Sequence, residues 1–156
     1  MLDTFLSEFL VSSEAPIMIE EQTYVIVEPE LVPNLMTLIY QYGVADLKYS
    51  ALFEETAYDN HSKQGPVLVQ LSNENDSFSQ LMKLFTLRPC GCFLQTNIPF
   101  SKVLDWARNA LNVSAQNKIS LFRFYEPRML FALLGALTSD EKNNFLKNIN
   151  SLYWFH

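Results

Sequence analysis

Residues 121–130 read LFRFYEPRML, and this stretch decides how the chain is expected to fold. Its first half is rich in aliphatic and aromatic residues, a composition typical of a strand buried on both faces. Pro127 then ends the strand, because proline fits the first turn of a helix, where its missing N–H would have had no partner. Leucines at helical spacing follow. The stretch therefore predicts an elbow in which a buried strand near residues 119–125 turns directly into a helix.

Two arginines lie in this elbow and need acidic partners. Arg123 is in the middle of the predicted strand, and an unpaired guanidinium is costly to bury. Arg128 lies in the first helical turn, where the positive end of the helix dipole disfavours a cation. We expect Arg123 to be buried and paired with a carboxylate, either from Glu126 or from the acidic first 60 residues. For both arginines, structural ion pairs and the carboxylate of a partner protein remain alternatives.

Outward from the elbow, strands and helices alternate along the chain. Further strands are predicted near residues 24–28, 66–71 and 91–96. Helices are predicted at residues 2–10, 32–42, 76–87, 99–111, 127–137 and 138–149, the last one opened by a capping box at Thr138 and Glu141. This order predicts a mixed α+β fold in one domain, residues 1–156. We expect a central mixed or mostly parallel sheet flanked by helices, with a C-terminal helical segment.

The composition indicates a protein that binds other proteins. Of the 156 residues, 49% are hydrophobic and only 18% are charged, which leaves more apolar surface than one core readily hides. The net charge of −6 argues against nucleic acid and against anionic membranes, because both attract basic surfaces. Residues 1–60 carry 11 acids and one base, whereas residues 61–156 carry 6 acids and 10 bases. We expect the acidic first part to fold back onto the basic second part.

The sequence shows no export signal and no membrane span. The apolar residues of 2–10 fall on one helical stripe with Asp3 and Glu8 between them, which predicts an amphipathic helix. A secretory signal needs a basic start and a longer apolar run. A run of the 18 or so apolar residues that a membrane span requires is also missing. We therefore expect the chain to reside in the cytoplasm.

No metal, cofactor or catalytic group is predicted. Cys90 and Cys92 form a C-x-C pair, and the two histidines, His61 and His156, are distant in sequence, so we expect reduced, buried cysteines rather than a zinc site. Glycine-rich phosphate loops and the G-x-S-x-G elbow are absent. The arginines and Tyr125 of the elbow could bind an anion, but no nucleophile or base accompanies them in the sequence.

The elbow resembles the signature of the adaptor family of bacterial type VI secretion. That signature reads L-F-R-F-Y-D-P-R-x-L and is followed by a leucine-rich helix and a short final helix. The matching residues are Leu121, Phe122, Arg123, Phe124, Tyr125, Pro127 and Arg128, with Glu126 in place of the aspartate of the family. Weaker similarities occur at residues 24–28, 52–53, 65–69 and 91–94.

The resemblance implies a non-enzymatic cytoplasmic chaperone without a cofactor. Such a protein holds a cognate toxic effector and helps to load it onto the spike protein of the secretion apparatus, so the effector and the spike are the implied partners. A toxin-neutralising immunity protein and a small enzyme that uses the elbow are the alternatives. We expect Leu121, Phe122, Arg123, Phe124 and Pro127 to be structural. We expect Tyr125, Glu126 and Arg128 to stand at the exposed end of the elbow and to contact the effector.

Overall fold

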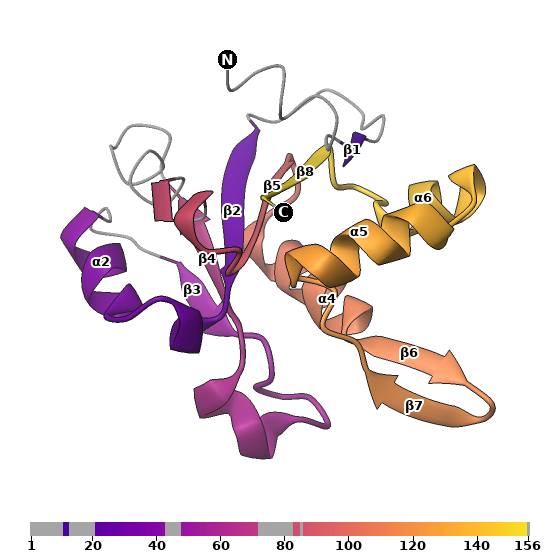
Figure 1. The fold of residues 1–156 in the computed structure, drawn as a ribbon, viewed down its shortest axis with the longest axis horizontal. Coiled ribbons are helices and arrows are strands. Elements are labelled where there is room, and N and C mark those ends of the chain that lie inside the picture. Colours follow the sequence, from indigo (N-terminus) through magenta and orange to yellow (C-terminus); the bar gives the residue numbers. More distant parts are fainter. Residues whose placement is uncertain (1–10, 13–20, 43–47, 72–82, 85, 156) are drawn as a thin grey trace.

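The computed structural model of the chain describes residues 11–12, 21–42, 48–71, 83–84 and 86–155 (Figure 1). The amphipathic helix predicted at residues 2–10 lies outside the described residues. Most of the helix predicted at residues 76–87 does so as well, although residues 83–84 and 86–87 are helical.

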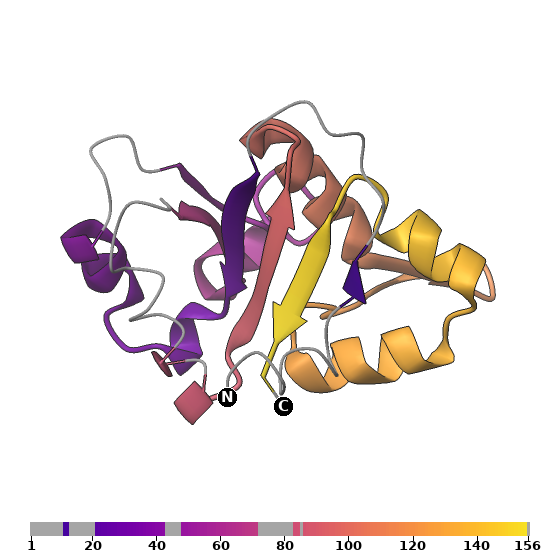
Figure 2. The ribbon, with the colours of Figure 1, turned by 90° about the horizontal axis from the view of Figure 1, so that it is seen from above.

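Six strands form one sheet in the order β1-β8-β5-β2-β4-β3, and every neighbouring pair is antiparallel. The strands are β1 (Val11–Ser12), β2 (Gln22–Val27), β3 (Tyr49–Ala51), β4 (Val67–Leu71), β5 (Gly91–Thr96) and β8 (Ser151–Trp154). Figure 2 shows β2, β5 and β8 side by side. The strands predicted at 24–28, 66–71 and 91–96 are confirmed as β2, β4 and β5. The predicted mixed or mostly parallel arrangement is wrong.

Burial of the strands on both faces explains this error. In β2, Tyr24 and Ile26 belong to one hydrophobic cluster, whereas Val25 and Val27 belong to another. Because successive side chains of a strand point to opposite faces, the two clusters lie on opposite sides of the same sheet. Strands covered on both sides have uninterrupted apolar runs, a pattern that is usual in parallel sheets. The apolar runs therefore indicated the double burial correctly but carried no information about strand direction.

Helices supply the two outer layers. The helices are α2 (Leu35–Tyr42), α4 (Phe100–Ala110), α5 (Pro127–Ala136) and α6 (Ser139–Phe145), with short 3-10 helices at η1 (Pro29–Leu31) and η2 (Asp59–Gln64). Residues of α2 join the cluster around Val25, while α4, α5 and the end of α6 join the cluster around Tyr24. Figure 1 shows α2 on one side of the sheet and the other three helices on the opposite side. The predicted capping box is confirmed, because Thr138 and Glu141 each accept a hydrogen bond from the backbone N–H of the other.

A separate hairpin, β6 (Asn112–Ala115) and β7 (Lys118–Leu121), replaces the predicted buried strand at residues 119–125. It projects from the end of α4, away from the large sheet (Figure 1). Both turn residues, Gln116 and Asn117, have positive φ, as a tight two-residue hairpin turn requires. All four residues of β7 are exposed, so the prediction of a strand buried on both faces is wrong. The local turn pairs β7 with β6 and keeps it out of the sheet.

β5 lies between β2 and β8, and sequence patterns did not reveal β8. The four residues of β8 alternate between partly buried and buried positions, with Leu152 and Trp154 inward. That alternation was the available signal, but a run of four residues is too short to stand out. The prediction of a single domain over residues 1–156 stays a prediction, since it includes residues outside the described ranges.

Candidate functional site

The elbow is a hairpin that leads through a turn into α5. The ladder of the hairpin ends where the Phe122 N–H donates to the Leu111 carbonyl at 2.7 Å. The Glu126 N–H then donates to the Arg123 carbonyl at 3.1 Å and closes the turn. Pro127 is the first residue of α5, which confirms the predicted helix start. Only the strand half of the predicted elbow is wrong, because it stops at Leu121 instead of continuing to residue 125.

Aromatic packing holds this turn against the helices. Phe124 and Tyr125 are both fully buried and meet edge to face with ring centroids 5.6 Å apart. Phe124 also packs edge to face on Trp106 of α4 at 5.5 Å. The Trp106 indole N–H donates to the Phe145 carbonyl at the end of α6 at 2.7 Å. The predicted structural role of Phe124 agrees with this burial, whereas Tyr125 is not at an exposed end, as the sequence had suggested.

A cluster of charges lies beside the buried rings. Arg123 contacts Glu126 with 3.0 Å between Nη1 and Oε1, and the same Nη1 lies 3.6 Å from Oε1 of Glu28. The predicted carboxylate partners of Arg123 are therefore confirmed, one from Glu126 and one from the acidic first 60 residues. The Arg123 side chain is 51% exposed, so its predicted burial is wrong. The more buried member is Glu28, whose side chain is only 13% exposed.

Burial sets the protonation behaviour of this cluster. It raises the pKa of Glu28, and the nearby Arg123 guanidinium offsets only part of that effect. Burial and the Glu28 carboxyl also raise the pKa of Tyr125, so its phenol stays protonated at neutral pH. The buried Tyr125 hydroxyl is close enough to be influenced by Glu28, but its geometry falls short of a hydrogen bond. The two carboxyl groups engage the Arg123 guanidinium, and no ionised tyrosine is left to act as a base.

Exposed groups of the elbow lie on the outer side of α5. Arg128 is exposed in the first helical turn, and Met129 and Phe131 are exposed large apolar residues nearby. A side chain added at Gly135 would meet no atom within 4 Å, so this side of the helix is open within the described structure. Buried Leu130 and Leu134 form the inner side. Of the three residues predicted to contact an effector, Arg128 is exposed, Glu126 is partly exposed and Tyr125 is not exposed.

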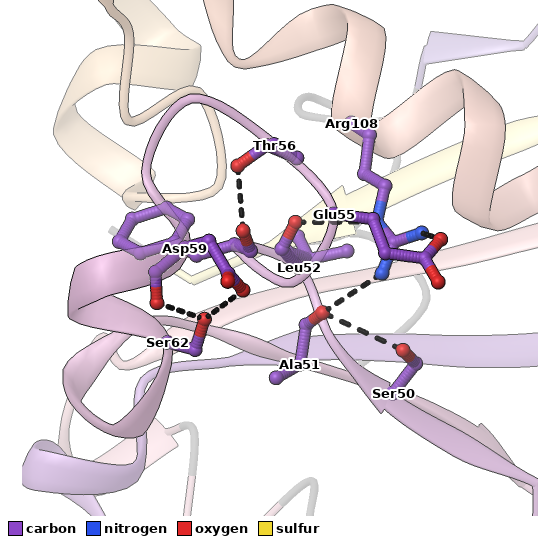
Figure 3. Close-up of polar contacts among 9 residues, drawn as sticks. Ser50, Ala51, Leu52, Glu55, Thr56, Asp59, Ser62 and Arg108 are labelled. Atoms are coloured by element: carbon purple, nitrogen blue, oxygen red, sulfur yellow. Dashed lines mark hydrogen bonds and ion pairs between the residues drawn. The ribbon is translucent and has the colours of Figure 1, made fainter.

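A second arginine cluster, which the sequence did not reveal, joins α4 to the loop after β3 (Figure 3). Arg108 donates to the carbonyl oxygens of Ala51 and Leu52 at 3.3 Å each and pairs with Glu55 at 3.4 Å. Its side chain is only 16% exposed. Arg108 lies three residues before the buried Leu111, so the two are neighbours on the surface of α4 and Arg108 lies at the margin of its buried face. This spacing was the available sequence signal that Arg108 is mostly buried. Because its donors face acceptors of this chain, the cluster is a structural clamp.

The cysteines are buried, as predicted. Cys90 and Cys92 are free and 2% and 0% exposed. Burial raises the pKa of Cys90 to about 11, and it raises the pKa of Cys92 further still. Both are therefore thiols rather than thiolates at neutral pH, and a thiol is a poor metal ligand and a poor nucleophile. Within the described ranges, no three histidine, cysteine or acidic residues lie close enough together to hold a metal ion.

These features define an α+β protein with a two-sided antiparallel sheet and an elbow whose polar groups mostly satisfy one another. The model of the family described as domain of unknown function DUF4123 matches residues 23–144. The chain therefore belongs to this family, which is associated with adaptors of type VI secretion. A search of curated proteins and a search of solved structures gave no further match. In the part of the chain that the structure describes, no helix has the length and apolar character needed to cross a membrane.

Proposed function

We propose that the chain is a non-enzymatic adaptor chaperone that binds a toxic effector of type VI secretion in the cytoplasm and assists its loading onto the spike protein. Membership of the DUF4123 family over residues 23–144 carries this proposal. The elbow at residues 121–128, on which the resemblance to the adaptors rests, lies inside that match.

The character of the elbow supports binding rather than catalysis. Arg123 is held by two carboxylates, and Tyr125 is a buried, protonated phenol, so neither is poised to attack a substrate. Arg128, Met129 and Phe131 instead offer an exposed cation beside exposed apolar side chains. Such a combination suits the recognition of a protein, because apolar area supplies affinity and charge supplies orientation.

The effector surface that we propose is the outer side of α5 together with the end of the elbow. Arg128 and the accessible part of Glu126 contact the effector directly. Tyr125 contributes only by fixing the turn from beneath, because it is fully buried. Of the five residues expected to be structural, Phe122, Arg123, Phe124 and Pro127 keep that assignment in the proposal. Leu121 does not, because it is 37% exposed at the end of β7.

The experiment that tests this function is an activity assay on a purified complex. The tagged full-length chain is expressed in its native host, and the toxin that co-purifies with it is identified. We expect the toxin to keep its activity when the chain is present at saturating concentration, because an adaptor needs to carry its cargo and not to inhibit it. A toxin that loses its activity in stoichiometric complex would instead identify an immunity protein. A chain that captures no toxin would contradict both functions.

A further inference from the structure

The outer edges of the large sheet are short and partly covered. Lys48 and Leu52, on either side of β3, form backbone hydrogen bonds with Gln70 and Pro66 on the β4 side. Because inward and outward residues alternate along a strand, the backbone groups of Ala51 point outward. Arg108 donates to that outward Ala51 carbonyl (Figure 3). At the other edge, β1 has two residues. Short or capped edges prevent unwanted strand pairing.

Within the described part of the chain, the outer edge of the hairpin, formed by β7, is neither short nor covered in this way. The bond from Phe122 to Leu111 and the pairing of Ser120 with Val113 set the ladder, in which bonded pairs alternate with non-bonded pairs. Ser120 and Lys118 therefore point their backbone groups toward β6. It follows that the backbone N–H and C=O groups of Ile119 and Leu121 point to the outer edge. Among the described residues, no strand pairs with this edge.

The side chains along this open edge are apolar. Ile119 is 73% exposed and Leu121 is 37% exposed. Because they are two residues apart in one strand, both side chains lie on the same face of the hairpin. A two-stranded ribbon is marginally stable alone, and an exposed apolar strand edge is a template for another strand. The hairpin therefore combines unpaired backbone groups with apolar side chains at the same two residues.

We propose that the outer edge of β7 is the site where an extended segment of the effector adds a third strand to the hairpin. The inference rests on the proposed adaptor function and deepens it by naming the mode of recognition. Backbone hydrogen bonds to Ile119 and Leu121 hold the segment, and its alternate apolar side chains cover these two residues. This site adjoins the elbow, since β7 ends where the elbow turn begins.

Charge identifies the segment as acidic. Residues 108–138 contain four cations, Arg108, Lys118, Arg123 and Arg128, and a single anion, Glu126. Arg108 pairs with Glu55, and Arg123 pairs with Glu126 and Glu28, so Lys118 and Arg128 are the cations of this stretch that have no carboxylate partner among the described residues. Lys118 and Arg128 are exposed, and Arg123 is half exposed. A strand with carboxylates complements this end of the molecule. A second copy of the chain is disfavoured as the occupant, because it would bring the same cations against one another.

The test uses the full-length chain and the toxin that co-purifies with it. Ile119→Pro removes the outward N–H, and proline is tolerated at an outward edge position, so the hairpin is expected to survive. The matched control is Ser114→Pro, which makes the same change opposite Ile119 on the outer edge of β6. Ile119→Thr keeps the backbone donor and the branched shape. We expect Ile119→Pro to weaken toxin binding by about tenfold or more in calorimetry, with Ser114→Pro unchanged and Ile119→Thr intermediate.

Four outcomes decide the inference. Unchanged affinity of Ile119→Pro overturns the strand site while leaving the adaptor function intact, whereas a wild-type chain that binds no toxin overturns both. A wild-type dimer that Ile119→Pro dissociates makes a second copy the occupant and overturns the assignment to the effector. If a variant fails to fold, amide hydrogen exchange measured by NMR on the wild-type chain gives an independent test. The Ile119 and Leu121 amides should exchange freely in the free chain and at least tenfold more slowly in the complex. Amides already protected in the free monomer overturn the inference.

Discussion

At the scale of residues, the interaction of Arg123 with Glu28 shows how burial and exposure are divided within one ion pair. The guanidinium is half exposed, whereas the carboxylate, at the end of β2, is mostly buried. The carboxylate therefore loses more of its hydration than the guanidinium does. The arginine side chain offsets this cost by pairing with the carboxylate from the surface. Glu126 completes the cluster from the N-cap position of α5 and contacts Arg123 rather than capping the helix.

Replacement of Arg123 by alanine should destabilise the fold by about 1–2 kcal/mol, because it leaves the buried Glu28 carboxylate without its cation. A buried arginine would have predicted a loss of about 3 kcal/mol or more. The matched control is Lys102→Ala, which breaks an exposed pair with Asp105 and should change stability by less than about 0.5 kcal/mol. Urea unfolding of both variants measures the difference. Equal effects of the two substitutions would show that Glu28 does not depend on Arg123.

The raised pKa of Glu28 predicts a specific pH dependence. Because the folded state holds the Glu28 proton to higher pH than the unfolded state does, this group lowers the stability as pH rises through that interval. Glu28→Gln removes the titration. The difference in unfolding free energy should therefore shift in favour of the variant as pH rises above about 4, near the unfolded-state pKa of a glutamate. Free energies of unfolding of the two proteins at several pH values measure this difference. A change with rising pH that favours the wild-type chain would mean that folding lowers the pKa of Glu28 instead.

Arg128 tests the proposed effector surface. Arg128→Glu reverses the charge in the first turn of α5, where the helix dipole favours an acid, so the fold should be preserved or slightly stabilised. If this residue contacts an acidic effector, affinity should fall by about tenfold or more. Lys147→Glu, at an exposed position just after α6, is the matched charge reversal outside the elbow. Retained affinity in the folded Arg128→Glu variant would place the effector elsewhere.

At the scale of elements, Gly91 shows that the close approach of two strand backbones depends on the absence of a side chain. A Cβ at Gly91 of β5 would lie 1.9 Å from the carbonyl oxygen of Ile26 in β2, a contact that the paired strands cannot relieve by a rotamer change. In contrast, a Cβ at Gly135 of α5 would meet no atom within 4 Å.

Two glycine-to-alanine substitutions should therefore have opposite effects. Gly91→Ala should cost about 3 kcal/mol or more, because strand β5 must move away from β2. Gly135→Ala should stabilise the chain by about 0.5–1 kcal/mol through the higher helix propensity of alanine. Thermal unfolding of the two variants beside the wild-type chain measures both effects. A stable Gly91→Ala variant would contradict the close pairing of β2 and β5.

Local signals in the sequence predicted the elements well. Proline at the start of α5, the capping box at Thr138 and the apolar runs of β2, β4 and β5 each depend on neighbours within a few residues, and the structure confirms all of them. In contrast, the direction of the strands, the pairing of β5 with β8 and the exposure of β7 depend on contacts between distant segments. A sequence pattern that records only burial cannot supply them.

The candidate site was predictable to the same degree. The carboxylate partners of Arg123 follow from its charge alone, since a guanidinium near a core needs an acid. The burial of Tyr125 was missed, because the ring packs on Phe124 within a turn that the sequence presented as the end of a strand. The open edge of β7 could not be foreseen, because its exposure depends on the hairpin turn at Gln116 and Asn117.

At the scale of the whole molecule, the uneven charge along the chain is partly resolved by folding. The pairs Glu28–Arg123 and Glu55–Arg108 each join an acid of the first 60 residues to an arginine of the second part, as predicted. Lys118 and Arg128 remain exposed near the hairpin and α5. Two of the exposed cations thus lie where we propose that the effector binds.

Export of the toxin from living cells tests the adaptor function most directly. The measurement compares the toxin in culture medium and in cells for the wild-type strain, a strain lacking this chain, and the same strain with the chain restored, using a catalytically inactive toxin so that cell death does not interfere. The account predicts that loss of the chain removes the toxin from the medium, that other type VI cargo is still exported, and that restoration recovers export. Toxin export at the wild-type level without the chain would contradict the account.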